Sequence, residues 1–339
     1  MIVSTATLPG LLEECFAANL VPFVTGPPAI GKSAIINQVA ADHKLEVIDI
    51  RLSQSDPTDL NGFPMINDTK TKASFIPMET FPVKGDTPPP GKDGWLIFLD
   101  EMNSAPLGVQ AAAFKLTLDR KVGQYDLHEN VFIACAGNRA GDKGITNRIS
   151  TPMQSRLAHF ELEVDNKAWL KWAAKDIDFR IRSFIGFKPD LLYRFEPDHD
   201  GATYPSPRTW EFMSRLLKKY PGAIPSEKMP LLASVVEEAA AMEFWTYSKV
   251  FQSLLTEQQI MNDPSGVKVP EEPSIQFALA GSLGQKMTTA NASPLMTFIQ
   301  RMPIEMQVLC MQGACRRDGS LMAQKDIDNW FDSYSKDLF

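Results

Sequence analysis

Short apolar runs recur through the first half of the chain, each about as long as a buried β-strand. Val21–Thr25, residues 95–99 and residues 131–136 contain no charged side chain. Strands of a parallel sheet that is covered on both faces have this uninterrupted apolar pattern. Leu45–Arg51 instead alternates apolar and charged residues, the period-two pattern of a strand. Residues 159–164, before the pattern changes, are a further candidate strand.

Apolar residues at helical spacing separate these strands. Residues 8–19 and 33–41 read as helices, and another helix follows residue 104, with Asn103 or Ser104 as its N-cap. Beyond residue 164 the pattern is helical almost throughout. The helical stretches are residues 169–185, 207–220, 229–255, 274–287 and 304–315. The pattern therefore predicts two domains, an α/β domain over 1–164 and a helical region over 165–339.

The turn after the first apolar strand has a specific motif. It fits G-x-x-x-x-G-K-[ST], the loop that binds phosphate groups through backbone N–H groups at a helix N-terminus. Its residues are Gly26, Pro27, Pro28, Ala29, Ile30, Gly31, Lys32 and Ser33. We expect Lys32 to reach the outer phosphates and the Ser33 hydroxyl to ligate Mg²⁺. A chance glycine-flanked turn is the alternative, but the strand before the motif and the helix after it favour nucleotide binding.

Two acidic residues follow the apolar run at 95–99. Ligands of parallel sheets bind at the carboxyl ends of the strands, so Asp100 and Glu101 should lie at the same edge as the phosphate loop. Asp100 is suited to the Mg²⁺ shell, and Glu101 can orient or deprotonate an attacking water. Asn138 ends the run at 131–136, where its amide could bond the terminal phosphate or that water. Acids or an asparagine in a surface turn are the alternative interpretation.

Residues 53–94 interrupt the alternation of strands and helices. Seven of the 25 prolines of the chain lie in this stretch. Connections longer than about 12–15 residues are uncommon unless they are functional or disordered. Turn-forming residues surround Asp59, Gly62 and Phe63, which favours a functional loop over a neutral surface insertion.

Composition limits the classes of function. The 339 residues carry a net charge of −7, with about −5 before residue 165 and −2 after it. Neither half is basic, so we do not expect nucleic acid as the main partner. The four cysteines contain no C-x-x-C pair, which favours buried thiols in a reducing compartment. No apolar run approaches the ~20 residues of a membrane span, and no secretory signal is visible, so the expected location is cytoplasmic.

Together these motifs resemble the AAA+ ATPases, and most closely the MoxR-like branch. The similarity covers roughly residues 8–220. The specific elements are the phosphate loop and the strand end at Asp100 and Glu101. Residues 53–62 are similar to the branch's insertion in its second helix. Residues 136–138 resemble its sensor-1 strand end. Residues 153–157 resemble the segment that carries its arginine finger, and residues 206–208 resemble its sensor 2.

The resemblance implies a fold, an assembly and roles for two arginines. The fold would be a five-stranded parallel sheet between helices, followed by a helical lid domain. The active form would be a homo-oligomeric ring, commonly a hexamer, that binds ATP at subunit interfaces and works with a von Willebrand A domain partner. Arg156 would be the arginine finger, with Arg148 as a second candidate, and Arg208 would contact the nucleotide. Ala29 stands where the family usually has glycine.

Three functions compete on these observations. The leading hypothesis is an ATP-hydrolysing remodeller of a protein partner. A P-loop kinase of a small acceptor is the second, and a nucleotide-dependent assembly module on DNA is the third. The acidic pair at 100–101, Asn138 and the long helical remainder favour hydrolysis over phosphate transfer. The acidic composition disfavours DNA.

Overall fold

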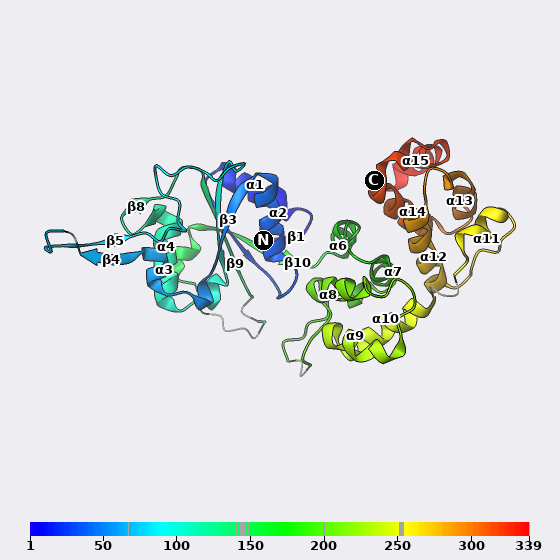
Figure 1. Ribbon diagram of the computed structural model, residues 1–339, viewed down its shortest axis with the longest axis horizontal. Helices are drawn as coiled ribbons and strands as arrows, with labels where there is room; N and C mark the ends of the chain where they lie inside the picture. The colour runs from blue at the N-terminus through cyan, green and yellow to red at the C-terminus, as the bar shows by residue number, and fades with distance from the viewer. Residues whose placement is uncertain are drawn as a thin grey trace. The chain divides into compact units, whose positions relative to one another are not determined.

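The computed structural model describes the chain except for residues 67, 140, 143–146, 148, 199–200, 251–253 and 339; the side chains of 335–338 are also outside the description. The chain forms two compact units (Figure 1). The first comprises residues 1–165 and 196–198, and the second comprises residues 166–195 and 199–339. The division into an α/β domain over 1–164 and a helical region over 165–339 stays a prediction.

The first unit is built on a parallel sheet of six strands. Their order across the sheet is β1-β10-β2-β9-β6-β3, and every neighbouring pair is parallel. The strands are β1 (Ile2–Ser4), β2 (Val21–Thr25), β3 (Leu45–Arg51), β6 (Gly94–Asp100), β9 (Val131–Gly137) and β10 (Leu157–Glu163). The predicted α/β fold with a central parallel sheet is confirmed. The sixth strand, β1, was not predicted, because three largely accessible residues give no apolar run.

Helices cover both faces of this sheet. On one face, α4 (Leu107–Asp119) packs its buried residues against alternate side chains of β6, among them Ile97 and Leu99. The intervening side chains of β6, Leu96 and Phe98, point to the other face and are fully buried. There α2 (Lys32–Asp42) contacts β3, β6 and β9, and α1 (Leu8–Ala17) packs on α2. Burial on both faces explains why β6 has the uninterrupted apolar pattern.

The insertion at residues 53–94 has secondary structure of its own. After the short helix α3 (Pro57–Asn61), strands β4 (Phe63–Ile66) and β5 (Ala73–Ile76) form an antiparallel hairpin, which extends away from the sheet in Figure 1. Gly62 has a φ of +87°, and a Cβ there would lie 2.3 Å from the Ile76 carbonyl oxygen. Phe81, later in the insertion, is buried in the core of the unit. A second hairpin, β7 (Lys121–Val122) and β8 (Tyr125–Asp126), follows α4.

Helices make up the second unit. They are α6 (Asn166–Ala173), α7 (Phe179–Phe187), α8 (Pro207–Leu217), α9 (Met229–Val236), α10 (Glu238–Val250), α11 (Glu257–Asn262), α12 (Pro273–Lys286), α13 (Ala292–Ile299), α14 (Ile304–Arg317) and α15 (Lys325–Leu338). The stretches predicted at 169–185 and 229–255 are each two helices rather than one. Between α9 and α10, Glu237 has a φ of +82°, which ends the first helix.

Two groups of side chains form the interior of this second unit. Phe184 of α7 lies with its ring centroid 5.6 Å from those of Trp210 and Phe244, which joins α7, α8 and α10. A separate cluster joins α12, α13, α14 and α15 through residues such as Leu283, Phe298 and Trp330. In the described part of the chain, none of the helices is both long and apolar enough to cross a membrane.

Candidate active site

The phosphate-loop motif connects β2 to α2, as predicted. Gly31 is the N-cap of α2 and has a φ of +100°, and Ile35 N donates to its carbonyl oxygen at 3.0 Å. Gly26 lies against β10, where a Cβ would come within 2.7 Å of the Leu162 carbonyl oxygen. The first N–H groups of α2 have no partner within the helix and carry its positive dipole end, so this turn is suited to a phosphate.

Ala29 adopts the left-handed conformation within this loop, with a φ of +62°. Glycine has that conformation at no steric cost, whereas an L-residue is disfavoured by roughly 1–2 kcal/mol. The alanine that replaces the family's usual glycine therefore keeps the turn geometry and accepts a backbone penalty.

Lys32 is buried within the loop, with only 9% of its surface exposed. Its Nζ donates to the carbonyl oxygens of Gly26 and Pro27, at 2.8 and 2.9 Å. The same ammonium group lies 3.4 Å from Asn138 Oδ1, at the end of β9. The lysine thus connects the phosphate loop to the neighbouring strand, and its charge lies at the end of the loop where phosphates would be held.

Ser33 and Asp100 come together from α2 and the end of β6. Ser33 Oγ donates to Asp100 Oδ2 at 3.2 Å, while Asp100 Oδ1 accepts from the Glu101 backbone N–H at 2.8 Å. Within the described residues, no cluster of three or more His, Cys, Asp or Glu side chains is arranged for a metal. A hydroxyl and a carboxylate nevertheless fit Mg²⁺, which usually takes one or two protein oxygens and completes its shell with phosphates and water.

Glu101 lies directly beyond β6 in the left-handed conformation, with a φ of +56°. Its Oε2 accepts a hydrogen bond from Ser53 Oγ, in the 3₁₀ turn Leu52–Gln54 that follows β3. The turn is the first segment of the insertion. Ser53 was not among the predicted site residues, because 48 positions separate it from Glu101 and no motif joins them.

Asn138 is held by Asn103, a second residue that the motifs did not assign to the site. Asn103 Nδ2 donates to the Asn138 carbonyl oxygen at 2.6 Å, and the Asn138 N–H donates to Asn103 Oδ1 at 3.1 Å. A Cβ on Gly137 would lie 2.3 Å from Asn103 Oδ1, so only glycine leaves room for this pair. The prediction that Asn103 or Ser104 caps the next helix is wrong: α4 begins at Leu107 after Pro106, and Asn103 is buried against β9.

Arg156 is exposed on the segment between α5 (Thr151–Gln154) and β10. Its Nη1 donates to the Pro152 carbonyl oxygen at 2.6 Å, and its guanidinium carbon lies 4.9 Å from the centroid of the Phe114 ring. Glu161, one of the acids that could have paired with it, lies 3.8 Å from Arg139 instead. Among the described residues Arg156 forms no ion pair. Arg148, the second candidate finger, lies outside the described residues.

Arg208 belongs to the second unit and is exposed in the first turn of α8. The start of this helix is fixed by a capping box, in which Ser206 Oγ accepts from Thr209 N at 3.2 Å. A cation gains nothing from the dipole at a helix N-terminus. The predicted contact between Arg208 and a nucleotide therefore depends on an anion outside its own helix and stays a proposal.

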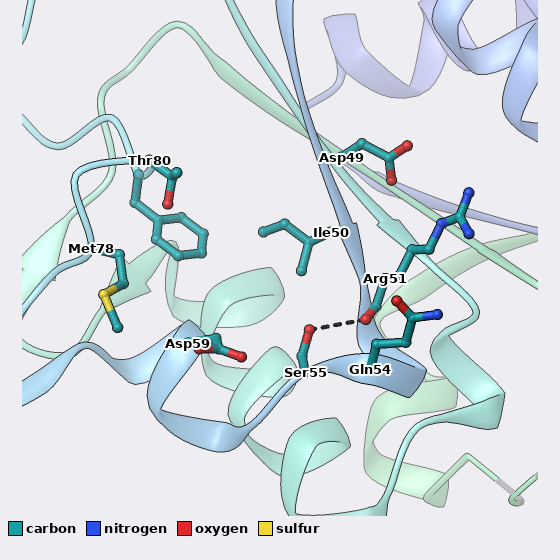
Figure 2. Close-up of a pocket in the computed structure, with 9 residues that line it drawn as sticks. Asp49, Ile50, Arg51, Gln54, Ser55, Asp59, Met78 and Thr80 are labelled. Carbon is teal, nitrogen blue, oxygen red and sulfur yellow. Dashed lines mark hydrogen bonds between the residues drawn. The ribbon is translucent and has the colours of Figure 1, made fainter.

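Within the first unit, a cavity of about 620 Å³ opens at the end of β3 (Figure 2). Its wall includes Asp49, Arg51 and Asp59, and Ser55 Oγ donates to the Arg51 carbonyl oxygen at 2.9 Å. Burial raises the pKa of Asp49, and the nearby charge of Asp100 raises it further, while Arg51 lowers it. The phosphate loop does not line this cavity. The candidate phosphate site is therefore defined by the chemistry of the loop and not by this cavity.

Comparison with known proteins gives structural matches alone. No protein-family model matches the sequence, and the search of curated proteins found no match. An ATPase candidate from Cytophaga hutchinsonii is 13% identical, with a TM-score of 0.36 over 90% of this chain and 79% of that one. The Thermotoga maritima RuvB Holliday junction branch migration motor is 13% identical, with a TM-score of 0.37 over 83% and 80%. A variant of that RuvB is 14% identical, with a TM-score of 0.40 over 82% and 81%.

The superpositions on these structures are loose, and the proteins share few identical residues with this chain. Its function is therefore argued below from its own side chains.

Proposed function

We propose that this chain is a Mg²⁺-dependent ATPase of the AAA+ class, of the MoxR-like branch, which remodels a protein partner. One observation carries the proposal: the end of the sheet brings Lys32, Ser33 and Asp100 together, with Asn138 3.4 Å from the lysine. Four functional groups from the phosphate loop, β6 and β9 thus meet where a nucleotide's phosphates would lie.

Phosphate binding is the task of the loop and of Lys32. The N–H groups at the start of α2 supply donors, and the helix dipole supplies partial positive charge. The Lys32 ammonium now donates to two loop carbonyl oxygens, and it would exchange these bonds for phosphate oxygens. Burial strengthens such a charged contact, because little water competes for the ammonium group.

Ser33 and Asp100 would hold Mg²⁺. When bound, the ion neutralises charge on the phosphate oxygens. Asp100 is fixed for this role, because its second oxygen accepts from the Glu101 backbone N–H. The Ser33 hydroxyl would turn from Asp100 Oδ2 to the cation.

Glu101 and Asn138 would act on the attacking water. The Glu101 carboxylate would accept a proton from that water, and the Asn138 amide would orient it against the terminal phosphate. Two observations support these roles. Glu101 lies directly beyond Asp100 in a left-handed conformation, and Asn103 holds the Asn138 backbone from both sides. Strain of this kind is frequent at functional sites.

A homo-oligomeric ring, to be tested first as a hexamer, would complete the site from the neighbouring subunit. Arg156 supports this proposal, because its guanidinium is exposed and has no acidic partner among the described residues. An arginine that reaches a neighbour's phosphate stabilises charge in the transition state and contributes on the order of 10³–10⁵ in rate.

The β4–β5 hairpin is the surface that we propose for the protein partner, such as a von Willebrand A domain protein. Its exposed apolar side chains are Phe63, Met65, Ile66, Phe75 and Ile76. Large apolar side chains gathered on one projecting segment mark interaction surfaces more often than scattered ones do. We further propose a cytoplasmic location, since Cys15, Cys135 and Cys310 are free, buried thiols of the kind found in reducing compartments.

Two substitutions test hydrolysis directly. Lys32→Ala should weaken ATP binding, whereas Glu101→Gln should bind ATP and lose turnover; Lys84→Ala and Glu129→Gln, at exposed positions, are the matched controls. The measurement is phosphate release with no acceptor present, together with nucleotide affinity. Equal turnover of Glu101→Gln and the unmodified protein would refute the role of Glu101. Phosphate transfer that requires an added acceptor would favour a kinase instead.

A further inference from the structure

A second polar cavity lies wholly within the helical unit. It has a volume of about 480 Å³ and opens between the α6–α7 connection, α7, the end of α8 and the C-terminal ends of α12 and α14. Sites for small molecules are commonly clefts of about 300–1,000 Å³. None of the residues assigned above to ATP binding or hydrolysis lines it.

Positive charge dominates the wall of this cavity. Five cationic side chains line it, and they come from four segments: Lys175, Arg182, Lys218, Arg316 and Arg317. Two carboxylates line it as well, Asp176 and Asp178. The formal charge of the wall is therefore about +3, in a chain whose net charge is −7.

Neither carboxylate forms an ion pair with one of these cations in the described part of the chain. Asp178 is bound to Arg180, which lies outside the wall: Oδ1 accepts from Arg180 Nε at 3.0 Å and Oδ2 from Nη2 at 2.8 Å. Asp176 is exposed and forms no ion pair with a described residue. The positive charge of the wall is thus left for a ligand or for solvent.

Arg182 has the least favourable position of the five. It lies in the first turn of α7, where the helix dipole disfavours a cation, and its Nε is buried without a hydrogen-bond partner. Burial lowers the pKa of Arg182; Asp178 opposes this shift, and the charge of Arg316 adds to it. A buried donor without a hydrogen-bond partner is destabilising, and more so when the group is charged. The charge of Asp178 opposes this effect in part, but no described residue supplies the missing hydrogen bond to Arg182 Nε.

The surrounding helices hold the arginines in place. Gly284 of α12 approaches α14 so closely that a Cβ would lie 2.8 Å from the Cys310 carbonyl oxygen. Gly281, one turn earlier, would place a Cβ 3.2 Å from Ser183 of α7. Arg182 directly precedes Ser183, and Arg316 is the second-last residue of α14. Close packing on α12 therefore fixes the separation of the two cations despite their repulsion.

We propose that this cavity is a binding site for a small phosphate-bearing anion with at least two negative charges. Guanidinium groups bind phosphate oxygens through paired N–H donors, and three arginines on converging helices can contact one diphosphate group from several sides. The volume accommodates a diphosphate with room for an attached nucleoside. The phosphate loop contributes no residue to the wall of this cavity, and the proposal does not depend on the function proposed for that loop.

Binding is tested in the full chain carrying Lys32→Ala, which weakens the first site. Inorganic pyrophosphate is titrated calorimetrically at physiological salt, and ADP is titrated separately. We expect saturable binding with one pyrophosphate per chain. Arg316→Gln, at an exposed position, should weaken it by about tenfold or more, since the substitution removes a hydrogen bond to a charged group. Arg182→Gln should have the same direction of effect, with circular dichroism as the check on folding.

Arg215→Gln is the matched control, because Arg215 is an exposed arginine of α8 that pairs with Glu211 outside the cavity. Its affinity for pyrophosphate should equal that of the parent. Equal affinities for pyrophosphate and ADP would assign recognition to the phosphates alone, and tighter binding of ADP would identify a nucleotide as the source. The proposal is wrong if pyrophosphate does not saturate, if Arg215→Gln weakens binding as much as Arg316→Gln does, or if a hexaglutamate peptide binds in its place.

Discussion

Ser53 donates a hydrogen bond to the side chain of Glu101 and thereby joins the first turn of the insertion to the proposed catalytic carboxylate. The two residues come from neighbouring strands, since Ser53 follows β3 and Glu101 follows β6. Beyond Ser53 the same segment leads through α3 into the exposed hairpin. The hairpin is thus connected to Glu101 through α3 and the hydrogen bond of Ser53.

The first prediction concerns this bond. Ser53→Ala should lower kcat by about three- to tenfold and leave nucleotide affinity unchanged, because a freely rotating Glu101 is poorly placed for the attacking water. Steady-state kinetics and a binding titration measure the two effects. Ser55→Ala is the control, since the Ser55 hydroxyl bonds the Arg51 carbonyl oxygen instead. Ser53→Thr, which keeps the hydroxyl, should restore the rate; a normal rate in Ser53→Ala would show that the bond does not position Glu101.

The second prediction concerns the support of Asn138. Asn103→Ala should lower the free energy of unfolding by about 1–3 kcal/mol, because it leaves the partly buried N–H and carbonyl of Asn138 without this partner. It should also slow ATP hydrolysis. Urea unfolding and phosphate release measure the two changes, with Ser104→Ala as the neighbouring control. A free energy of unfolding equal to that of the parent protein would contradict this prediction and would mean that water replaces the Asn103 amide.

The third prediction concerns Arg156 and assembly. Arg156→Ala should bind ATP normally and hydrolyse it slowly, by a factor on the order of 10³ if the guanidinium reaches a neighbour's phosphate. A surface arginine without that role would contribute at most about 1 kcal/mol. Mixing Arg156→Ala with Lys32→Ala should restore part of the activity, because mixed interfaces combine an intact loop with an intact arginine. Wild-type turnover in the assembled Arg156→Ala protein would direct attention to Arg148.

The fourth prediction concerns the hairpin. Phe63→Ser, Ile66→Ser and Phe75→Ser combined should change the free energy of unfolding little, because these side chains are between 44% and 70% exposed. Fluorescence of a dye that binds apolar surfaces should fall, and stimulation of the ATPase by a protein partner should be lost. Deleting the insertion as a whole is a poorer test, because it would also remove the buried Phe81. Full stimulation of the triple variant would exclude the hairpin as the contact surface.

Local patterns predicted the fold because the strands that meet the core are buried on both faces. β6 and β9 have apolar runs that admit few other interpretations. The hairpin was missed for the opposite reason. Pro64 lies within β4, and both strands carry exposed apolar residues, so neither shows the alternation of a half-buried strand. The helix breaks near residues 174–178 and at Glu237 depend on capping and backbone conformation, which periodicity does not report.

The site was predictable where one motif contains its own geometry. The loop at 26–33 fixes Lys32 and Ser33 because eight consecutive residues specify the turn and the helix start. Asn103 and Ser53 could not be identified in this way, since their hydrogen-bond partners lie 35 and 48 positions away in the sequence. These hydrogen bonds form only when the chain folds. The conformation of Ala29 could not be predicted from its residue type, because the left-handed conformation is typical of glycine and the surrounding loop imposes it on alanine.

The pairing of β1 with β10 has a consequence for synthesis on the ribosome. Ile2 lies opposite Glu161, so this edge of the sheet joins residues almost 160 positions apart. β10 also separates β1 from β2, although β1 precedes β2 in the chain. During translation β1 therefore stays unpaired until β10 has emerged from the ribosome. Translation adds about 5–20 residues per second. The nascent sheet would complete this edge last, about 8–30 seconds after β1 leaves the exit tunnel.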